Sequence, residues 1–340
     1  RVAKQKIADS GKIINDFINA KDADIIWTSG ATESNNLAIK GFVDASTKTK
    51  KHIITTSIEH KAILDVCNYL SHKDENVSVS YLDVDNHGRI DLEQLKQLIT
   101  NDTVMVSVMA VNNEVGVTNP LKEIGEITRQ KGIVFHVDAA QGIGKVEIDV
   151  EKMNIDLLSM SAHKCYGPKG IGALYVRKGI ELAEQIHGGR HQNGMSSGTL
   201  PTQQIAAFAK AVELLDQKTD LAKIKHYRDT VIENFSRLDS VIINTPIDQS
   251  YVGILSVTVE GVAGDILFTL MPEFALSMSS ACTSTADKPS HVLMQLGLNA
   301  KQAASTLRIS FGCFTKEEDV QKLVKSLVRN ISLLRNIHKG

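Results

Sequence analysis

The stretch DIIWTSGATESNNLAIKG, residues 24–41, decides the fold class of this chain. Asp24–Thr28 is an apolar run of strand length, small residues follow at Ser29 and Gly30, and a helix is expected to open within Ala31–Ser34 and run to about Ala45. A strand that turns directly into a helix is the repeating unit of α/β proteins. Further copies of this unit are therefore expected along the remaining chain.

The same alternation continues for more than a hundred residues. Strand-length apolar runs and helical patterns with apolar residues three or four apart follow one another in turn. The expected strands are His52–Thr56, Val77–Tyr81, Thr103–Met109, Ile133–Val137 and Ile155–Met160, and the expected helices are Lys61–Ser71, Asp91–Ile99 and Leu121–Lys131. The pattern predicts a mostly parallel sheet with helices on both faces.

After Thr199 the pattern changes to α+β. The expected helices there are Thr202–Gln217, Leu221–Leu238, Gly264–Leu270 and Lys316–Asn336, and the expected strands are Val241–Asn244, Ile254–Val259 and Thr306–Ser310. We therefore expect a large α/β domain over residues 1–220 and a smaller α+β domain over residues 221–340.

Composition narrows the class of protein. The 340 residues are 42% hydrophobic and 23% charged, with a net charge of −1, so charge favours neither a nucleic acid nor an anionic membrane as partner. No apolar run is long enough for a transmembrane helix. The four cysteines show no metal-binding or disulfide spacing, so we expect no metal site and a reducing, cytoplasmic setting.

The turn before the first expected helix is a candidate phosphate site. Free backbone N–H groups at a helix N-terminus bind phosphate, and the hydroxyl of Thr32 can assist. The alternative is an ordinary capped helix, with Thr32 or Ser34 as the N-cap. No Gly-Lys-Ser/Thr follows, so the stretch is not a P-loop.

Two further expected strands are followed by side chains that can take part in binding or catalysis. Asp138 ends the strand VFHVD, where a carboxylate can hold a ring N–H or simply cap the next turn. Lys164 follows the next strand in SAHK, where a desolvated amine can form a Schiff base, although most lysines are surface groups. Together with the phosphate site these are the three contacts that pyridoxal 5'-phosphate (PLP) requires: phosphate, pyridinium nitrogen and aldehyde.

The second domain adds a thiol and a guanidinium. Cys282 lies in the small, polar stretch SMSSACTST, where an exposed thiol suits nucleophilic or carrier chemistry. Cys67, Cys165 and Cys313 have the character of structural cysteines. Arg308 lies inside an apolar strand and needs an anionic partner, which can be a structural carboxylate or the carboxylate of a substrate.

Taken in order, the motifs TSGATESNNLAIKG, EHKAILD, VNNEVG, HVDAAQ, SAHKCYGPKGIGALYVR, GMSSGTLPT and SSACTS resemble those of cysteine desulfurases of the IscS/NifS type. These enzymes have PLP fold-type I and belong to the class V aminotransferases. The resemblance covers essentially the whole chain. It implies that L-cysteine is converted to L-alanine, and that the sulfur is held as a persulfide on Cys282 before transfer to an acceptor protein, such as an iron–sulfur scaffold, or to thio-cofactor or tRNA thiolation.

The resemblance also implies roles for individual residues. Lys164 would bind PLP covalently, Asp138 would pair with its ring nitrogen, and Arg308 would clamp the carboxylate of the substrate. The other implied contacts are the ring stacking of His60, which also moves protons, the ring hydroxyl near Gln141 and Asn113, and the phosphate contacts of Ala31, Thr32, Ser161 and His163. Thr199 would reach the phosphate of a neighbouring subunit, which implies a homodimer.

This sequence departs from the family pattern in three places. Members of the family carry, near their start, a Leu-Asp-Asn-Ala-Ala-Thr-Thr-like stretch that these 340 residues do not contain, and Ser196 replaces a frequent arginine. The residues given also lack the C-terminal extension that iron–sulfur scaffold proteins bind in IscS. Two alternatives stay open. One is another fold-type I enzyme, an aminotransferase or selenocysteine lyase, which would not need the thiol of Cys282. The other is a non-catalytic sulfur-relay subunit.

Overall fold

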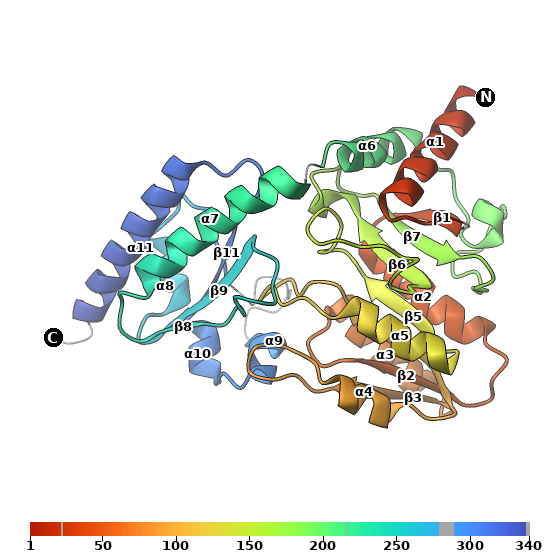
Figure 1. Ribbon diagram of the computed structural model, residues 1–340, viewed down its shortest axis with the longest axis horizontal. Helices are drawn as coiled ribbons and strands as arrows, with labels where there is room; N and C mark the ends of the chain where they lie inside the picture. Colours follow the sequence, from red (N-terminus) through yellow and green to blue (C-terminus); the bar gives the residue numbers. More distant parts are fainter. Residues whose placement is uncertain (22, 216, 279–288, 338–340) are drawn as a thin grey trace. The chain divides into compact units, whose positions relative to one another are not determined.

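The computed structural model describes residues 1–21, 23–215, 217–278 and 289–337 and divides the chain into two compact units (Figure 1). The first, here the large unit, comprises residues 1–83, 90–110 and 119–216. The second, the small unit, comprises residues 84–89, 111–118 and 217–340. The chain therefore passes between the units several times.

The large unit is built on a seven-stranded sheet in the order β1-β7-β6-β5-β4-β2-β3. The strands are β1 (Ala23–Thr28), β2 (Lys51–Thr56), β3 (Val77–Leu82), β4 (Thr103–Met109), β5 (Val134–Asp138), β6 (Leu157–Ser161) and β7 (Gly172–Arg177). The strands from β6 to β3 pair in parallel, whereas β7 is antiparallel to both of its neighbours. Because parallel strands end at the same edge, β2, β4, β5 and β6 all deliver their last residues to one side of the sheet.

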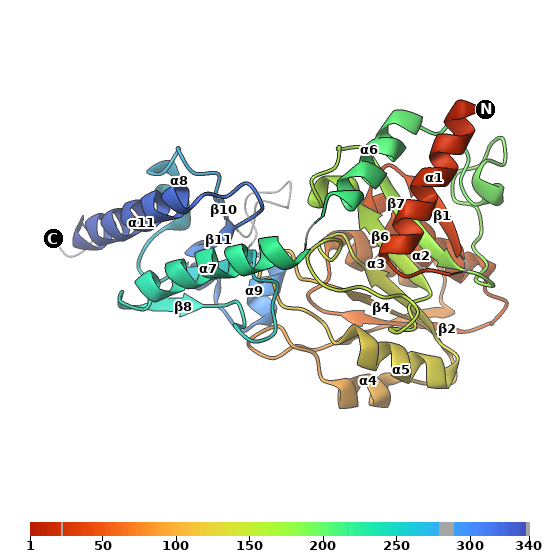
Figure 2. The ribbon, with the colours of Figure 1, turned by 45° about the horizontal axis from the view of Figure 1, so that its top comes forward.

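Helices cover both faces of this sheet, as the apolar strands require. They are α1 (Val2–Phe17), α2 (Ala31–Ala45), α3 (Lys61–Lys73), α4 (Leu92–Leu98), α5 (Leu121–Lys131) and α6 (Thr202–Glu213), with short 3-10 turns at Ala162–Lys164 and Gln192–Gly194. In Figure 1, α5 lies in front of the sheet and α2 and α3 behind it. Figure 2 shows α1 running alongside α6.

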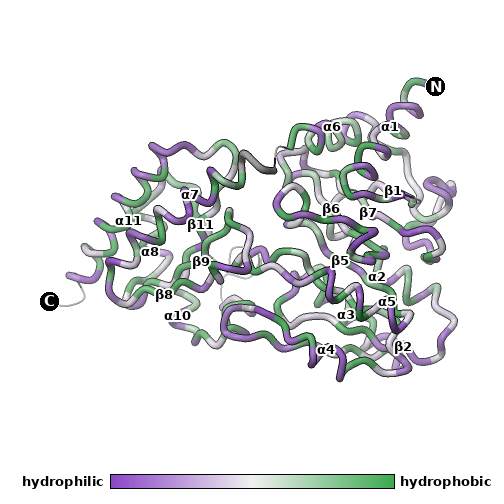
Figure 3. Tube along the Cα trace, viewed as in Figure 1, coloured by the Kyte–Doolittle hydropathy of each residue, from purple (hydrophilic) through white to green (hydrophobic). Residues whose placement is uncertain are grey.

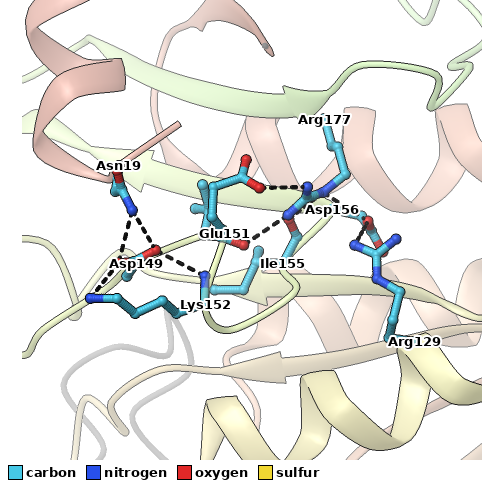
Figure 4. Close-up of polar contacts among 9 residues, drawn as sticks. Asn19, Arg129, Asp149, Glu151, Lys152, Ile155, Asp156 and Arg177 are labelled. Carbon is cyan, nitrogen blue, oxygen red and sulfur yellow. Dashed lines mark hydrogen bonds and ion pairs between the residues drawn. The ribbon is translucent and has the colours of Figure 1, made fainter. Parts of the chain in front are cut away.

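A polar cluster closes the amino edge of β6 (Figure 4). The guanidinium of Arg177 contacts carboxylate oxygens of Glu151 and Asp156, both at 3.2 Å, and donates to the carbonyl oxygens of Val150 and Ile155. Asp156, which is 5% exposed, also contacts Arg129 at 3.4 Å. Every charged group in this cluster has an opposite charge from the protein itself.

The small unit carries a four-stranded antiparallel sheet in the order β10-β11-β9-β8. Its strands are β8 (Val241–Ile243), β9 (Ile254–Val259), β10 (Ser277–Met278) and β11 (Thr306–Ser310), and its helices are α7 (Gln217–Phe235), α8 (Gly264–Thr269), α9 (His291–Gln295), α10 (Ala300–Ala304) and α11 (Glu317–Ile337). The buried residues of α11 recur three or four positions apart and pack into the core formed with β9 and β11. The resulting alternation of hydrophobic and hydrophilic residues is visible along α11 in Figure 3.

The α/β expectation is confirmed, with corrections to individual elements. The helices α1, α9 and α10 and the strands β7 and β10 were not expected. The helix α6 ends at Glu213, not at Gln217, and α7 begins at Gln217, not at Leu221. Within the described parts of the chain, no helix is long and apolar enough to cross a membrane.

Candidate active site

The helix α2 begins at the carboxyl edge of the large sheet without a side-chain cap. Its N-cap is Gly30, and no side chain bonds to the first-turn N–H groups. The alternative reading, with Thr32 or Ser34 as N-cap, is therefore wrong. Ser34 is buried, and its hydroxyl instead bonds to that of Thr28 at 2.8 Å. The first turn, with Ala31 and the exposed Thr32, is left available for a ligand.

Ser161 and His163 are neighbours of this helix start. Ser161 ends β6, and its hydroxyl oxygen lies 4.0 Å from where a β-carbon on Gly30 would stand. The same hydroxyl bonds to Nδ1 of His163 at 2.9 Å. Partial burial lowers the pKa of His163, and the charges of nearby lysines lower it further. The structure thus brings the helix start and two of the expected phosphate-binding side chains together.

A close backbone approach makes this arrangement possible. A β-carbon at Gly172, the first residue of β7, would stand 2.6 Å from the α-carbon of Gly30. Real side chains do not tolerate such a contact. Glycine at position 172 therefore lets the turn before α2 lie directly against the end of β6.

Asp138 ends β5 and is 5% exposed. Its Oδ1 accepts from the backbone N–H of Ala140 at 2.9 Å, and its Oδ2 accepts from the side-chain amide of Asn35 at 2.8 Å. Burial raises the pKa of Asp138, and these two hydrogen bonds oppose the rise. Asp138 forms no ion pair with the part of the chain that the structure describes. Oδ1 of Asp138 therefore caps the following turn. Oδ2 bonds to Asn35, a residue that the sequence analysis did not identify.

Lys164 stands at the end of the short turn after β6. Its side chain is exposed and makes no hydrogen bond or ion pair with another described residue. An unengaged primary amine at this edge of the sheet is free to react with a carbonyl.

His60 and Thr32 line one open cavity of about 460 Å³ between α2 and α3. His60 is the N-cap of α3, and its Nδ1 accepts from the backbone N–H of Ala62 at 3.1 Å. The accepting nitrogen carries no proton, so the ring's N–H is at Nε2. The partly buried Gln141, by contrast, accepts from the ammonium group of Lys145.

Thr199 and Ser196 line a second cavity of about 170 Å³ in the large unit. Thr199 is exposed, whereas Ser196 is 5% exposed. A buried serine at position 196 offers no long cationic side chain to this cavity.

In the small unit, Arg308 and Asn113 are brought together. One terminal nitrogen of Arg308 donates to the carbonyl oxygen of Asn113 at 2.8 Å, and the other donates to the hydroxyl of Ser277 at 3.2 Å. Its Nε is buried without a hydrogen-bond partner, and no carboxylate in the described residues lies within 4.0 Å of the guanidinium. The geometry does not support a structural ion pair for Arg308.

A second residue that sequence reasoning missed lies near Arg308. Glu114 is 5% exposed and accepts from the hydroxyl of Ser290 at 2.5 Å. Burial raises its pKa to about 7, and the Ser290 hydrogen bond and the charge of Arg308 oppose the rise. A glutamate next to the expected Asn113 was the only available signal in the sequence.

Three of the four cysteines are described, and none is in a disulfide. Burial raises the pKa of Cys67 to about 12 and that of Cys165 to about 11, so neither forms a thiolate readily at neutral pH. Cys313 is partly exposed. Cys282, the candidate nucleophile, lies outside the described residues.

The model of the family "Aminotransferase class-V" matches residues 2–323. The chain belongs to the class-V aminotransferase family. Within this family it is similar to "Cysteine desulfurase IscS" of Shewanella frigidimarina, at 46% identity over 99% of this chain and 82% of the relative. The corresponding protein of Shewanella oneidensis is 44% identical over the same shares.

Solved structures of the family have the same fold. A "NIFS-like protein" superimposes with a TM-score of 0.90 at 33% identity, over 97% of this chain and 88% of that one. "SspA in complex with cysteine" superimposes with a TM-score of 0.81 at 37% identity, over 92% and 88%. The resemblance and the fold expected from the sequence motifs are both confirmed.

Proposed function

We propose that this protein is a PLP-dependent cysteine desulfurase that converts L-cysteine to L-alanine and carries the sulfur on Cys282. The observation that carries this proposal is the arrangement at the carboxyl edge of the large sheet. Asp138 and Lys164 follow the adjacent strands β5 and β6 there, and the uncapped start of α2 follows β1, which is separated from β6 by β7 alone. The similarity to IscS proteins over nearly the whole chain supports the same activity.

The residues present fit PLP. The phosphate would be held by the backbone N–H groups of Ala31 and Thr32, with Ser161 and His163 beside them. His60 would stack on the ring, and Gln141 and Asn113 would approach its hydroxyl group. A dianionic phosphate suits this location because the N–H groups of the first turn have no side-chain cap and Ser161 and His163 lie beside them, while the carboxylate of Glu33 in the same turn is engaged by Ser29.

PLP, when bound, supplies an electron sink that makes the Cα proton of an attached amino acid acidic. Asp138 would keep the ring nitrogen protonated, because a buried carboxylate favours a cation beside it. Lys164 would hold PLP through its ε-amine, and that amine could take or return a proton at the substrate Cα. His60 can exchange a proton at Nε2, since its Nδ1 is occupied by the N–H of Ala62.

Arg308 would bind the carboxylate of the cysteine substrate. Its guanidinium is held in place by two neutral oxygens and has no protein anion within 4.0 Å in the described residues. Such a group favours an incoming carboxylate, which it can grip with two parallel hydrogen bonds.

Cys282 would accept the sulfur. Its thiolate would attack the sulfur of the bound cysteine, forming the new S–S bond while the C–S bond breaks and leaves its electron pair on Cβ. Protonation of that carbon would then give L-alanine. The sulfur is oxidised to the persulfide level and Cβ is reduced, so the step needs no external oxidant. The buried Cys67 and Cys165 are poorly suited to this role.

We infer three partners: the substrate L-cysteine, a sulfur-acceptor protein such as an iron–sulfur scaffold, and a second copy of the chain. The second copy would contribute its Thr199 to the phosphate of its neighbour.

A cytoplasmic location agrees with the absence of disulfides among the described cysteines. The aminotransferase, selenocysteine lyase and sulfur-relay alternatives find no support in the names of the relatives, which are cysteine desulfurases.

The test is incubation of the PLP-loaded protein with L-cysteine, with alanine and protein-bound persulfide as the readouts. Wild type should form both, and Cys282→Ser should form neither while still binding PLP and cysteine. As matched controls, Cys67→Ser, Cys165→Ser and Cys313→Ser should each retain alanine production. Continued alanine formation by Cys282→Ser, or persulfide on the Cys165 peptide, would overturn the assignment.

A further inference from the structure

Asn35 occupies an unfavourable place for its residue type. It lies in the second turn of α2, well inside the helix, and is 1% exposed. Asparagine is a poor helix former because its side chain competes with the backbone for hydrogen bonds, and a buried amide must find partners. A residue with these costs in this place calls for a compensating contact.

That contact is the carboxylate of Asp138. The Nδ2 group of Asn35 donates to Oδ2 of Asp138 at 2.8 Å, across 103 residues of sequence. The Oδ1 atom of Asn35 is buried and accepts no hydrogen bond from any residue that the structure describes. The contact with Asp138 is therefore the whole of the side chain's hydrogen bonding here.

The chemistry of the amide determines which state of Asp138 this contact favours. An amide nitrogen can only donate, so it is satisfied by an unprotonated carboxylate oxygen. The backbone N–H of Ala140 imposes the same requirement on Oδ1. Each oxygen of Asp138 thus meets one donor, which fixes the plane of the carboxylate without neutralising its charge.

The position of Asn35 along α2 adds a second constraint. Ala31, at the start of the helix, belongs to the candidate phosphate site, and Asn35 follows one turn later. Four residues of helix span about 6 Å. One rigid helix therefore contacts both the phosphate site and the carboxylate for the ring nitrogen.

We propose that Asn35 is a positioning residue, which holds the Asp138 carboxylate in register with the phosphate site so that both ends of PLP are bound at once. The inference rests on the proposed function. Asn35 acts through Asp138 and does not touch the reacting atoms. It should therefore influence PLP affinity and the electron-withdrawing power of the ring, but not recognition of the cysteine carboxylate.

The test is a double-mutant cycle on PLP affinity. The variants are Asn35→Leu, Asp138→Ala and the double substitution, and the dissociation constant is measured by titrating PLP into the PLP-free proteins and following absorbance. Asn35→Leu alone should raise the constant about tenfold. In the Asp138→Ala background the same substitution should change it less than twofold, because its target is gone.

The matched control is Asn244→Leu. Asn244 is also a buried asparagine that bonds to side chains, those of Ser256 and Thr258, but it lies in the small unit. It should lower thermal stability without changing PLP affinity. Asn35→Ala provides a second variant if the leucine does not fit the space.

The measurements distinguish a failure of the positioning role of Asn35 from a failure of the proposed function. Unchanged PLP affinity in folded Asn35→Leu and Asn35→Ala, or an equal loss in both Asp138 backgrounds, would overturn the positioning role. If the wild-type protein bound no PLP, the proposed function itself would be contradicted. For activity, kcat should fall while the KM for cysteine changes less than twofold, a split that a general loss of structure would not produce.

Discussion

Two carboxylates of the large sheet, Asp156 and Asp138, are equally buried at 5% exposure but have opposite surroundings. Asp156, at the amino edge, contacts Arg177 at 3.2 Å and Arg129 at 3.4 Å. Asp138, at the carboxyl edge, has only neutral donors, the N–H of Ala140 and the amide of Asn35. The buried charge of Asp156 is thus paired within the protein, whereas that of Asp138 is not. Asp138 can therefore pair with a cationic group of a bound ligand.

Two strand arginines repeat the contrast with the sign reversed. Arg177 on β7 contacts Glu151 and Asp156, whereas Arg308 on β11 contacts only a carbonyl and a hydroxyl oxygen. The charges that have partners are expected to stabilise the fold, and those without partners are expected to bind ligands.

The largest loss of turnover is expected when Lys164 is replaced. Removing the amine in Lys164→Ala should abolish covalent attachment of PLP and lower turnover by more than about a thousandfold, since a covalent catalyst is lost. Borohydride reduction followed by peptide mapping checks the attachment. The exposed Lys169 is the control, and Lys169→Ala should keep both properties. PLP trapped on a different lysine would refute the assignment.

The two carboxylates should respond in opposite ways. Asp156→Ala leaves the partly buried guanidinium of Arg177 with one carboxylate partner fewer and should lower the free energy of unfolding by about 3 kcal/mol. Asp138→Ala should lower the stability of the PLP-free protein less, because it removes an unpaired buried charge even though the buried amide of Asn35 loses its hydrogen-bond partner, but it should weaken PLP binding markedly. Chemical denaturation and PLP titration of both variants provide the measurements. Equal stability losses would erase the distinction.

Substitutions at Arg308 and Arg177 should likewise differ, with the first affecting substrate binding and the second affecting stability. Arg308→Lys should raise the KM for cysteine by about 10- to 30-fold, since an ammonium group lacks the two-pronged geometry that matches a carboxylate. Arg177→Lys should leave that KM unchanged and lower thermal stability instead. Steady-state kinetics and thermal unfolding distinguish them. If Arg308→Lys lost only stability, Arg308 would belong with the structural cations after all.

The smallest effect concerns His136, a buried residue on β5 that bonds to Ser107 and Ser159 on the neighbouring strands. Burial lowers its pKa to about 3, from 6.5. The unfolded chain therefore takes up a proton below about pH 6.5 that the folded protein refuses, and stability is lost as pH falls, by about 1.4 kcal/mol per pH unit.

Denaturation between pH 6 and pH 4 tests this expectation. His136→Gln should reduce the slope of stability against pH by about one proton, whatever its effect on absolute stability. The exposed His72 provides the comparison, and His72→Gln should keep the wild-type slope. An unaltered slope in His136→Gln would mean that the buried imidazole does take up a proton in the folded state.

The sequence predicted the features that depend on local pattern. Strands such as Thr103–Met109 were recognisable because parallel strands are buried on both faces and form continuous apolar runs. Asp138 and Lys164 were found because they immediately follow such strands. The helix α1 was missed because its start has no capping side chain, and for the strand β7 the preceding glycine- and proline-rich turn was a signal that was not used.

What could not be predicted depends on contacts between distant residues. The Asn35–Asp138 hydrogen bond spans 103 residues, and the Glu114–Ser290 hydrogen bond spans 176. Nothing in the local pattern around Asn35 or Glu114 distinguishes a buried polar group from an exposed one. These contacts depend on how α2 packs on the sheet and on how the turn of Glu114 meets the start of α9, which tertiary structure determines.

The interleaving of the two units has a consequence for synthesis on the ribosome. Residues 111–118 belong to the small unit, yet their partners are made much later, as in the bond from Gln249 to the carbonyl of Thr118, 131 residues apart. At about 5–20 residues per second, that segment waits roughly 7–26 s for its partner to be translated. During this interval the nascent chain exposes Val115 and Val117, which are fully buried in the finished protein, and a chaperone that binds short apolar segments would find its target there.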